Sequence, residues 1–204
     1  MTQEKVDLVR SNPAYKATKK MVFSEVPDMN FLQIDGKGNP DKSMEFQDAI
    51  EALYAISYGL KFMVKKGDIG IDYHVAPLEG LWWAKDMNDF RSGKKDNWLW
   101  TLMIMQPDFI TGSMIAEAKY YATEKKDLAA LHKMRFSKFA EGTSAQVLYT
   151  GPFDKEHDTI LALHEFIKSN GYELHGKHHE IYLSDMRRTA PEKLRTIIRQ
   201  PVKK

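Results

Sequence analysis

The chain contains no cysteine among its 204 residues. This absence excludes a disulfide framework, a thiolate metal site and a thiol nucleophile. An excess of charge of one sign is also missing, because 30 Lys and Arg residues balance 28 Asp and Glu residues. Proteins that hold DNA or RNA use positive charge to replace counterions, so this balance argues against a nucleic-acid partner.

Long apolar runs are absent as well. No stretch approaches the roughly 18 apolar residues of a membrane span, and the N-terminus lacks the apolar core of a signal peptide. We therefore expect a cytoplasmic protein with no membrane partner. With 43% hydrophobic and 28% charged residues, the chain has the composition of an ordinary globular domain, and it is long enough to bury a sizeable core.

The first part of the chain predicts a strand, a long helix and two further strands. A short apolar strand begins at Asn30 and ends in a glycine-rich turn. Ser43 is a suitable N-cap for an amphipathic helix that runs to Lys66 and Gly67. Strand-like segments follow at 71–84 and at 98–107, where the apolar run ends in a proline.

The last third repeats this order. A strand at 145–153 precedes a helix that ends at Asn170 and Gly171, in the manner of a left-handed C-cap. Strands are then expected at 172–174, at 178–185 and within 191–202. Runs of strands that pair locally, each with one long helix over one face, predict an α+β fold built from two pseudo-symmetric βαββ halves.

Two segments lie outside these halves. We expect a second long helix to start at Thr111 or Ser113 and to run, with interruptions, to Gly142. Residues 1–21 are rich in charge and are predicted to form a loosely held N-terminal arm, which leaves residues 22–204 as one domain.

The sequence HHEIYLSD places a carboxylate within a predicted strand. Alternate side chains of a strand point to opposite faces, so His179 shares one face with the apolar residues, and Glu180 shares the other with His178 and Tyr182. We expect the apolar face to meet the helices. Glu180 then faces either solvent or a groove between the halves.

Two interpretations of this carboxylate stay open. A solvated outer face is routine in antiparallel sheets. However, the strand at 98–106 is apolar on both faces, with Trp98 and Trp100 on the same one, and therefore needs cover on both. Aromatic walls around a few polar groups are typical of small-molecule pockets, although a Trp-rich strand is also common in cores. A carboxylate in such a pocket can neutralise a cation or act as a general base.

Several segments together resemble one known family. They are MNFLQIDGKGNP, EALYAISYGLKFMVKKG, PLEGLWW, NWLWTLMIMQPDFIT and YELHGKHHEIYLSDMRRTAPEKLRTIIRQPV. Over Val22 to Val202 the chain resembles the GyrI-like small-molecule-binding proteins, and in particular their stand-alone bacterial branch. The EGLWW and HHEIYLSD segments are similar to the subgroup of cyclopropanoid cyclopropyl hydrolases.

This resemblance implies a fold and a site. The fold would be two βαββ halves of the SHS2 type around a central concave groove, which takes lipophilic, planar aromatic and often cationic compounds. The HHEIYL motif matches the glutamate at the bottom of the groove to Glu180. For the aromatic walls we select Trp83, Trp98, Trp100 and Tyr149.

The resemblance also implies a reaction that needs neither a metal nor an organic cofactor. Cyclopropane-bearing DNA-alkylating compounds would be opened by addition of water. As a hypothesis, Glu180 is the general base and Tyr182 stabilises the developing oxyanion. Glu79 is a second candidate carboxylate, with a turn residue beside Gly80 as the plainer interpretation.

The rival functions are non-catalytic. The domain could bind or sequester drugs, or bind a protein in the way of a gyrase inhibitor, and the protein partner is unknown. The chain has no room for a separate helix-turn-helix domain, so we do not expect a direct repressor.

Other motifs predict little chemistry. His178 and His179 lie on opposite faces of a strand and are unsuited to one metal ion, so we expect solvated or sheet-edge histidines. Arg187 and Arg188 are expected to pair locally with Asp185.

Overall fold

The computed structural model describes residues 5–86, 89 and 92–204. In this part of the chain the strands form an antiparallel sheet in the order β1-β6-β9-β8-β3-β4-β2-β5, and β7 pairs with β9. The strands are β1 (Val22–Val26), β2 (Met29–Lys37), β3 (Leu78–Ala84), β4 (Trp98–Gln106), β5 (Arg135–Phe139), β6 (Gly142–Thr150), β7 (Glu173–Leu174), β8 (His178–Tyr182) and β9 (Arg195–Lys203).

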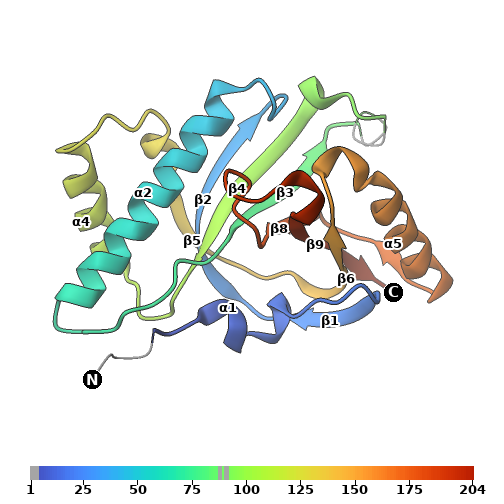
Figure 1. Cartoon of the computed structure of the whole chain (residues 1–204), viewed down its shortest axis with the longest axis horizontal. Helices are drawn as coiled ribbons and strands as arrows, with labels where there is room; N and C mark the ends of the chain where they lie inside the picture. Colours follow the sequence, from blue (N-terminus) through green and yellow to red (C-terminus); the bar gives the residue numbers. More distant parts are fainter. Residues whose placement is uncertain (1–4, 87–88, 90–91) are drawn as a thin grey trace.

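The helices are fewer and lie in front of the sheet or beside it (Figure 1). The α-helices are α1 (Leu8–Ser11), α2 (Met44–Lys66), α4 (Gly112–Thr123) and α5 (His157–Ser169). Short 3₁₀ turns are η1 (Pro13–Tyr15), η2 (Lys95–Asn97), η3 (Leu131–Lys133), η4 (Phe153–Lys155) and η5 (Pro191–Lys193).

The sheet consists of two halves with the same topology. In the first half, β2, α2, β3 and β4 follow one another, and the sheet order is β2-β4-β3. In the second half, β6, α5, β8 and β9 follow one another, and the order is β6-β9-β8. The halves join where β3 pairs with β8. The predicted pseudo-symmetric α+β fold is therefore confirmed.

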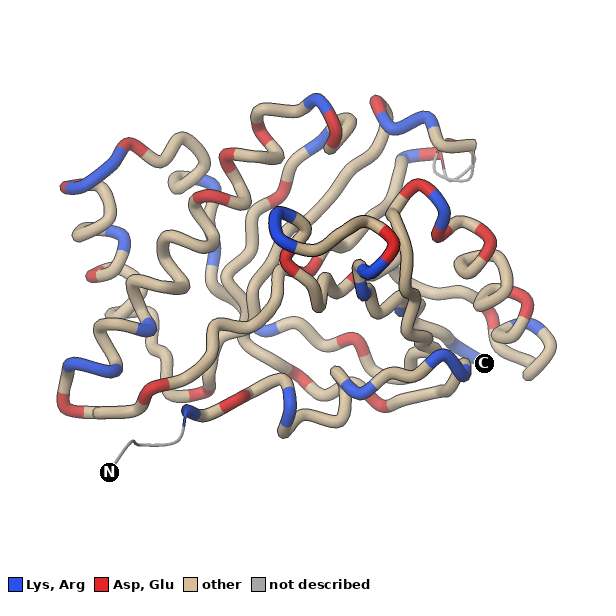
Figure 2. The backbone as a smooth tube through the Cα atoms, in the orientation of Figure 1, with Lys and Arg blue, Asp and Glu red and all other residues tan. Residues whose placement is uncertain are grey.

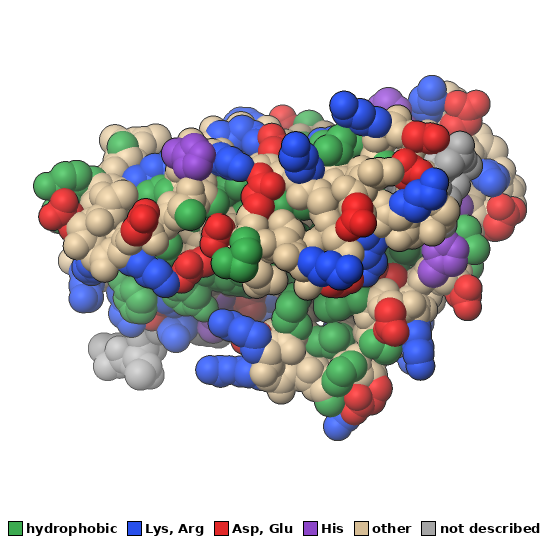
Figure 3. All heavy atoms as spheres, turned by 90° about the horizontal axis from the view of Figure 1, so that it is seen from above, with side chains coloured by type: hydrophobic (Ala, Val, Ile, Leu, Met, Phe, Trp, Pro, Cys, Tyr) green, Lys and Arg blue, Asp and Glu red, His purple; other side chains and the backbone are tan. Residues whose placement is uncertain are grey.

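The sheet curls into a half-barrel with a concave groove. The helices α2 and α5 lie on the same side of the sheet and flank its central strands (Figure 1). In the space-filling view, hydrophobic side chains are visible in a hollow along the lower side of the molecule, with charged side chains around it (Figure 3).

The long helix α2 forms where the sequence predicts it. The Ser43 side chain accepts a hydrogen bond from the Phe46 amide at 3.2 Å, which satisfies one free N–H group of the first turn. One face of the helix, including Leu53, Ile56 and Leu60, is fully buried against the sheet. Burying each such side chain stabilises the fold by about 1.5–3 kcal/mol, so packing rather than helix propensity holds α2 in place.

The expected helix from Thr111 to Gly142 is wrong in its second part. The helix α4 ends at Thr123, and Arg135–Phe139 forms strand β5 at the edge of the sheet, paired with β2. Gly142 begins β6 with a φ of 67°, a left-handed conformation that a glycine adopts readily. The predicted helix end is therefore a short connection between two strands that do not pair with each other, since β5 pairs with β2 and β6 pairs with β1 and β9.

The N-terminal arm is packed more firmly than we expected. Ala14 has no exposed surface, and Tyr15 is 5% exposed. Val6 forms an isolated parallel bridge with Tyr73, which ties the start of the arm to the loop before β3. The arm therefore supplies buried residues to the core.

Charge is mixed over the surface. Lys and Arg residues alternate with Asp and Glu residues along the helices and loops (Figure 2). Asp185 pairs with Arg187 at 3.1 Å and with Arg188 at 3.9 Å, which confirms the predicted local ion pairs. None of the helices in the described ranges has the length and hydropathy of a membrane span.

Candidate functional site

Glu180 lies at the centre of the sheet, where the two halves join. On β8 it stands opposite Gly80 of β3 on one side and Ile198 of β9 on the other. Its side chain shares the face of Trp82, which packs against Phe46 of α2 with ring centroids 5.8 Å apart. This is the helix-bearing, concave side. The expectation that His179 and its apolar neighbours would face the helices is therefore wrong, whereas Glu180 does face the groove between them.

The Glu180 carboxylate is held by its own strand. Glu180 is 8% exposed. The Tyr182 hydroxyl donates to Oε2 at 2.8 Å, and His178 Nε2 lies 3.1 Å from Oε1. Trp82 Nε1 in turn donates to the Tyr182 hydroxyl at 3.1 Å. Burial and the charges of Glu180 and Glu156 raise the pKa of Tyr182 well above its ordinary value, so the phenol keeps its proton.

A second carboxyl group lies beside Glu180. Glu156, the N-cap residue of α5, is 8% exposed and lies within hydrogen-bonding reach of the Glu180 side chain. Burial and the neighbouring charge of Glu180 raise the pKa of Glu156 far above its ordinary value. Two carboxylates in contact repel each other, so a site of this kind keeps one of them protonated.

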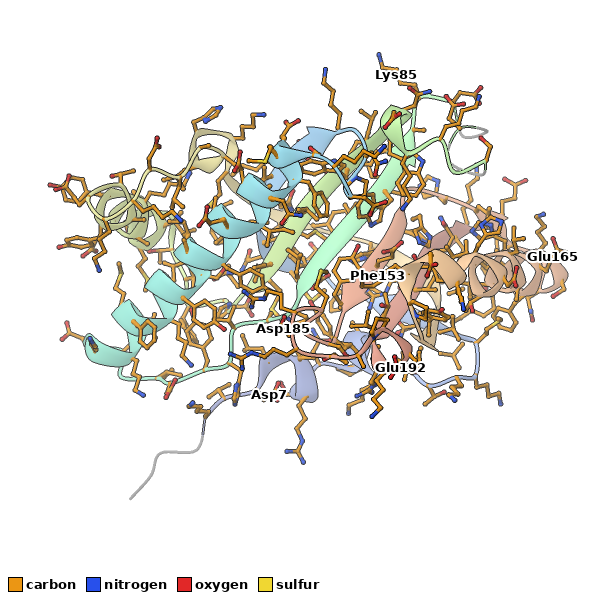
Figure 4. All side chains as sticks on the ribbon, turned by 45° about the horizontal axis from the view of Figure 1, so that its top comes forward. Asp7, Lys85, Phe153, Glu165, Asp185 and Glu192 are labelled. Carbon is orange, nitrogen blue, oxygen red and sulfur yellow. The ribbon has the colours of Figure 1, made fainter. Side chains whose placement is uncertain are left out.

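Aromatic rings surround these carboxyl groups. Trp82 meets Trp98 edge-on at 5.7 Å, and Phe46 meets Trp100 edge-on at 5.2 Å. Phe153 of η4 packs edge-on against Tyr182 at 5.5 Å. Figure 4 shows Phe153 and Asp185 over the central strands, between α2 and α5. The concave side of the sheet therefore holds buried carboxyl groups among packed aromatic rings, of which Trp100 has no exposed surface and Trp82 is 4% exposed.

Two glycines make room for the tryptophans. A Cβ atom on Gly36 would lie 2.1 Å from the Trp100 ring. A Cβ atom on Gly80 would lie 2.7 Å from Trp82 Nε1 and 3.0 Å from the Tyr182 hydroxyl. Real side chains do not approach so closely, so these positions let the large rings lie flat on the sheet.

The structure brings some of the predicted site residues together. Trp98 and Trp100 share the face of Glu180, as does Tyr149 through the register Tyr149–Thr196–Tyr182. The Tyr149 hydroxyl donates to the Pro152 carbonyl at 2.9 Å and so holds the turn that leads to Phe153 and Glu156.

Other predicted site residues lie on the opposite face. Trp83 is a neighbour of Trp82 in β3 and points away from it, and the Lys177 ammonium lies 3.4 Å from the centre of the Trp83 ring. Glu79 also points away from Glu180. It has no exposed surface, and it belongs to a separate charged cluster.

This cluster, which we call the far-face network, consists of Tyr15, Glu79, Glu141, His179 and Arg199. Tyr15 donates to Glu79 at 2.5 Å, and His179 bridges Glu79 at 3.0 Å and Glu141 at 2.9 Å. Arg199 Nη1 donates to Glu141 at 2.9 Å, and its Nη2 donates to the Ala14 carbonyl. Two acidic and two basic side chains therefore balance each other inside the protein.

The network shifts the pKa values of its members. Burial alone would lower the pKa of His179, but Glu141 and Glu79 together raise it to about 9. Burial alone would raise the pKa of Glu141, but His179 and Arg199 lower it to about 2. The expectation of solvated or sheet-edge histidines is thus wrong, since His178 and His179 are 3% and 1% exposed on a central strand.

Sequence reasoning missed the site residues that come from other elements. Glu156, Phe46, Phe153, His178 and Trp82 are not among the site residues selected from the sequence. Trp82 could have been found, because it alternates with Gly80 on the face of β3 that pairs with Glu180. Glu156 lies in a polar turn, and the sequence offers no comparable signal for it.

The site is suited to proton transfer on an apolar molecule. It combines a hydrogen-bonded carboxylate, a second carboxyl group whose pKa is raised, and packed aromatic rings. Within the described ranges no group of three or more His, Asp or Glu side chains is arranged to hold a metal ion.

Comparison with solved structures gives similar proteins that match this chain over nearly its whole length. The chain is 38% identical to an uncharacterized conserved protein from Listeria innocua, with a TM-score of 0.88 over 98% of this chain and 100% of that one. It is also 38% identical to a structure described as a hydrolase from Listeria innocua, with a TM-score of 0.85 and the same coverage.

More distant structures share the fold. The C-terminal domain of EcmrR is 17% identical over 91% of this chain and 98% of that one, with a TM-score of 0.58. No curated protein matches the chain. A family model described as the GyrI-like small molecule binding domain matches residues 19–203. The chain therefore belongs to the family of GyrI-like small-molecule-binding domains.

Proposed function

We propose that this protein binds lipophilic, planar aromatic molecules against the concave face of its sheet and hydrolyses those that carry a cyclopropane ring able to alkylate DNA. The observation that carries the proposal is the placement of Glu180. A buried carboxylate, held by Tyr182 and His178, stands in the middle of an aromatic face at the junction of the halves.

Other observations favour the same function. Membership of a small-molecule-binding family supports a ligand on this face. A Listeria innocua structure that shares 38% of its residues with this chain is described as a hydrolase, which favours turnover over simple retention. Placing a carboxylate in an apolar site costs several kcal/mol unless it is hydrogen-bonded, so its presence there favours a role in the chemistry.

The reaction can be written with balanced atoms. Glu180 takes a proton from a water molecule, and the water oxygen forms a bond to a cyclopropane carbon. The carbon–carbon bond of the strained ring breaks, and its electron pair moves through the conjugated system to a carbonyl oxygen. That oxygen becomes a phenolate and takes up a proton, so the net change is the addition of one water molecule.

Tyr182 has two uses in this scheme. In the structure its hydroxyl donates to Glu180, which holds the base in position. When Glu180 takes up a proton, its need for that hydrogen bond falls, and the hydroxyl becomes available to the developing oxyanion. Trp98, the partly exposed ring of the aromatic set, contributes binding energy by stacking and apolar burial, and it packs on Trp82, which is buried behind it.

The test compares the parent protein with Glu180→Gln. Both are incubated with a cyclopropane-bearing alkylator, and the water-added product is followed by mass spectrometry under multiple turnover. We expect the substitution to slow turnover about 100-fold or more, because general-base catalysis contributes on that order. Binding, followed by quenching of tryptophan fluorescence, should remain.

A matched control removes a carboxylate from the same region without touching the site. Glu165→Gln on the outer side of α5 should turn over like the parent (Figure 4). If Glu180→Gln is as fast as the parent, Glu180 is not the base. If the parent retains the compound intact, the protein is a binding module that sequesters its ligand.

A further inference from the structure

Glu156 is a buried acidic residue that the scheme above does not use. It stands at the N-terminus of α5 and is 8% exposed. Its Oε2 atom is buried and has no hydrogen-bond partner among the described residues. An ionised carboxylate with a bare oxygen inside a protein is strongly unfavourable, whereas the neutral acid is tolerated there.

The contacts of the neighbouring carboxyl group differ in kind. Glu180 receives the Tyr182 hydroxyl on one oxygen and has His178 Nε2 at 3.1 Å from the other. Hydrogen bonds from donors stabilise the ionised form of a carboxyl group. The structure therefore divides the roles: Glu180 is equipped to be the carboxylate, and Glu156 is equipped to carry the proton.

We propose that Glu156 is the general acid of this site. It holds the one proton that the two adjacent carboxyl groups share, and it delivers that proton to the oxygen on which negative charge develops, while Glu180 accepts a proton from the attacking water. This inference rests on the proposed function, because it assigns a further catalytic residue to that reaction.

The pairing also resets the site. After one turnover Glu180 is protonated and Glu156 is ionised, which is the reverse of the starting state. Because the two side chains lie within hydrogen-bonding reach, the proton can return directly from Glu180 to Glu156. No proton has to cross the aromatic wall from bulk water, and the net reaction remains the addition of water.

Charged groups from other elements shift the pKa of Glu156, and they therefore shift the pH at which activity is lost. Lys95, before β4, is the cation near the pair, and it favours ionised Glu156. The charge of Glu180 of β8 acts in the other direction and raises the pKa of Glu156. The charge of Glu156 in turn raises the pKa of two phenols, Tyr182 of β8 and Tyr149 of β6, and Asp154 of η4 acts on Tyr149 in the same sense.

The first experiment is the pH dependence of turnover. The parent should lose activity as the pH rises and Glu156 gives up its proton. Glu156→Gln keeps the size of the side chain but has no transferable proton, so we expect turnover at neutral pH to fall about 100-fold or more and the alkaline limb of the profile to disappear. Glu165→Gln on the same helix serves as the control and should keep the parent profile.

The second experiment needs no substrate. Protein carrying carbon-13 in its glutamate carboxyl groups is titrated by NMR, and Glu156→Gln assigns the resonance. We expect one carboxyl signal to remain in its protonated position at neutral pH, to vanish in Glu156→Gln, and to titrate at lower pH in Glu180→Gln, where the neighbouring charge is gone.

The outcomes separate this inference from the proposed function. If the parent turns over and Glu156→Gln matches it at every pH, Glu156 is not the acid, and the proposed function stands. If all glutamates are ionised at neutral pH, the shared proton does not exist, and the inference fails. If the parent forms no product at any pH, the proposed function fails, and the acid role fails with it.

Discussion

Gly80 is the residue at which one added methyl group would reach the site directly. Its position on β3 is opposite Glu180, and the Trp82 indole and the Tyr182 hydroxyl lie over its Cα atom. The hydrogen bond from Trp82 to Tyr182 depends on this closeness. The side chains that hold Glu180 are thus placed by a residue that has no side chain.

We predict that Gly80→Ala will damage the site more than the fold. The new Cβ atom would lie 2.7 Å from Trp82 Nε1, so the indole must move and Tyr182 loses its donor. Overpacking of this kind costs about 1–3 kcal/mol in stability. Ligand binding by fluorescence quenching should weaken at least about tenfold, while the circular dichroism spectrum stays that of the parent.

Gly112→Ala is the matched control for this prediction. Gly112 is the first residue of α4, and nothing lies within 4 Å of the place where its Cβ would stand. This substitution should leave binding unchanged. Unaltered binding in Gly80→Ala would show that the flat packing of Trp82 is not required for the site.

At the scale of the elements, the far-face network joins parts of the chain that are distant in sequence. It brings together the arm, β3, β8, β9 and the turn before β6, through Tyr15, Glu79, His179, Arg199 and Glu141. It occupies the side of β3 and β8 opposite to Glu180. The same pair of strands is thus fastened on one face by Glu79 and His179 and on the other by Trp82 and Tyr182.

The network predicts how stability changes with pH. The pKa of His179 is raised to about 9, so its contribution is complete below its ordinary pKa of 6.5 and is lost as the pH rises through 9. The pKa of Glu141 is lowered to about 2, so its contribution is present above its ordinary 4.5 and is lost as the pH falls through 2. Urea unfolding of the parent should therefore show maximal stability between these limits.

Glu141→Gln tests the assignment. It leaves His179 and Arg199 without their shared carboxylate, and removal of one partner from a buried ion pair costs about 3–5 kcal/mol. The decline of unfolding free energy toward high pH should become shallower in this variant. Glu173→Gln, an exposed pair with Lys203, is the control. Equal stability of Glu141→Gln and the parent at neutral pH would contradict the role of the network.

The elements also show what the sequence can and cannot predict. Period and capping were sufficient for α2, β4 and α5, because Ser43, the apolar run from Trp98 and the Asn170-Gly171 stop are local signals. Strand alternation separated Glu180 from His179 correctly. It could not say which face the helices cover, since both faces of the sheet are buried in the centre and that choice depends on long-range packing.

The features that the sequence does not predict depend on contacts between residues distant in sequence. Nothing near Glu180 in the chain indicates that Glu156 lies beside it, and nothing near His179 indicates Glu141 or Arg199. Strand β5 was missed because its five residues, RFSKF, are only partly buried at an edge. Such features arise from the sheet order, which the sequence pattern alone does not define.

At the scale of the whole molecule, the two halves have the same topology, but their hydrophobic cores differ in size. Helix α2 buries nine side chains, whereas α5 buries Leu163 and Ile167. The core under α5 is a small separate cluster that also contains Ala145, Val147, Ile198 and Val202. Local stability follows buried apolar contact, so the second half should open at a lower free energy than the first.

The half with the smaller core contributes directly to the site. Glu156 is the N-cap residue of α5, and Phe153, three residues earlier, packs on Tyr182. Since Glu156 and Glu180 are each only 8% exposed, a ligand must displace part of the second half to reach them.

Native-state hydrogen exchange should therefore show lower protection in α5 than in the centre of α2. A bound ligand should raise protection of α5 more than that of α2, because it binds the closed state and stabilises the segment that opens. Equal protection of both helices in the free protein would mean that ligand entry does not use opening of this half.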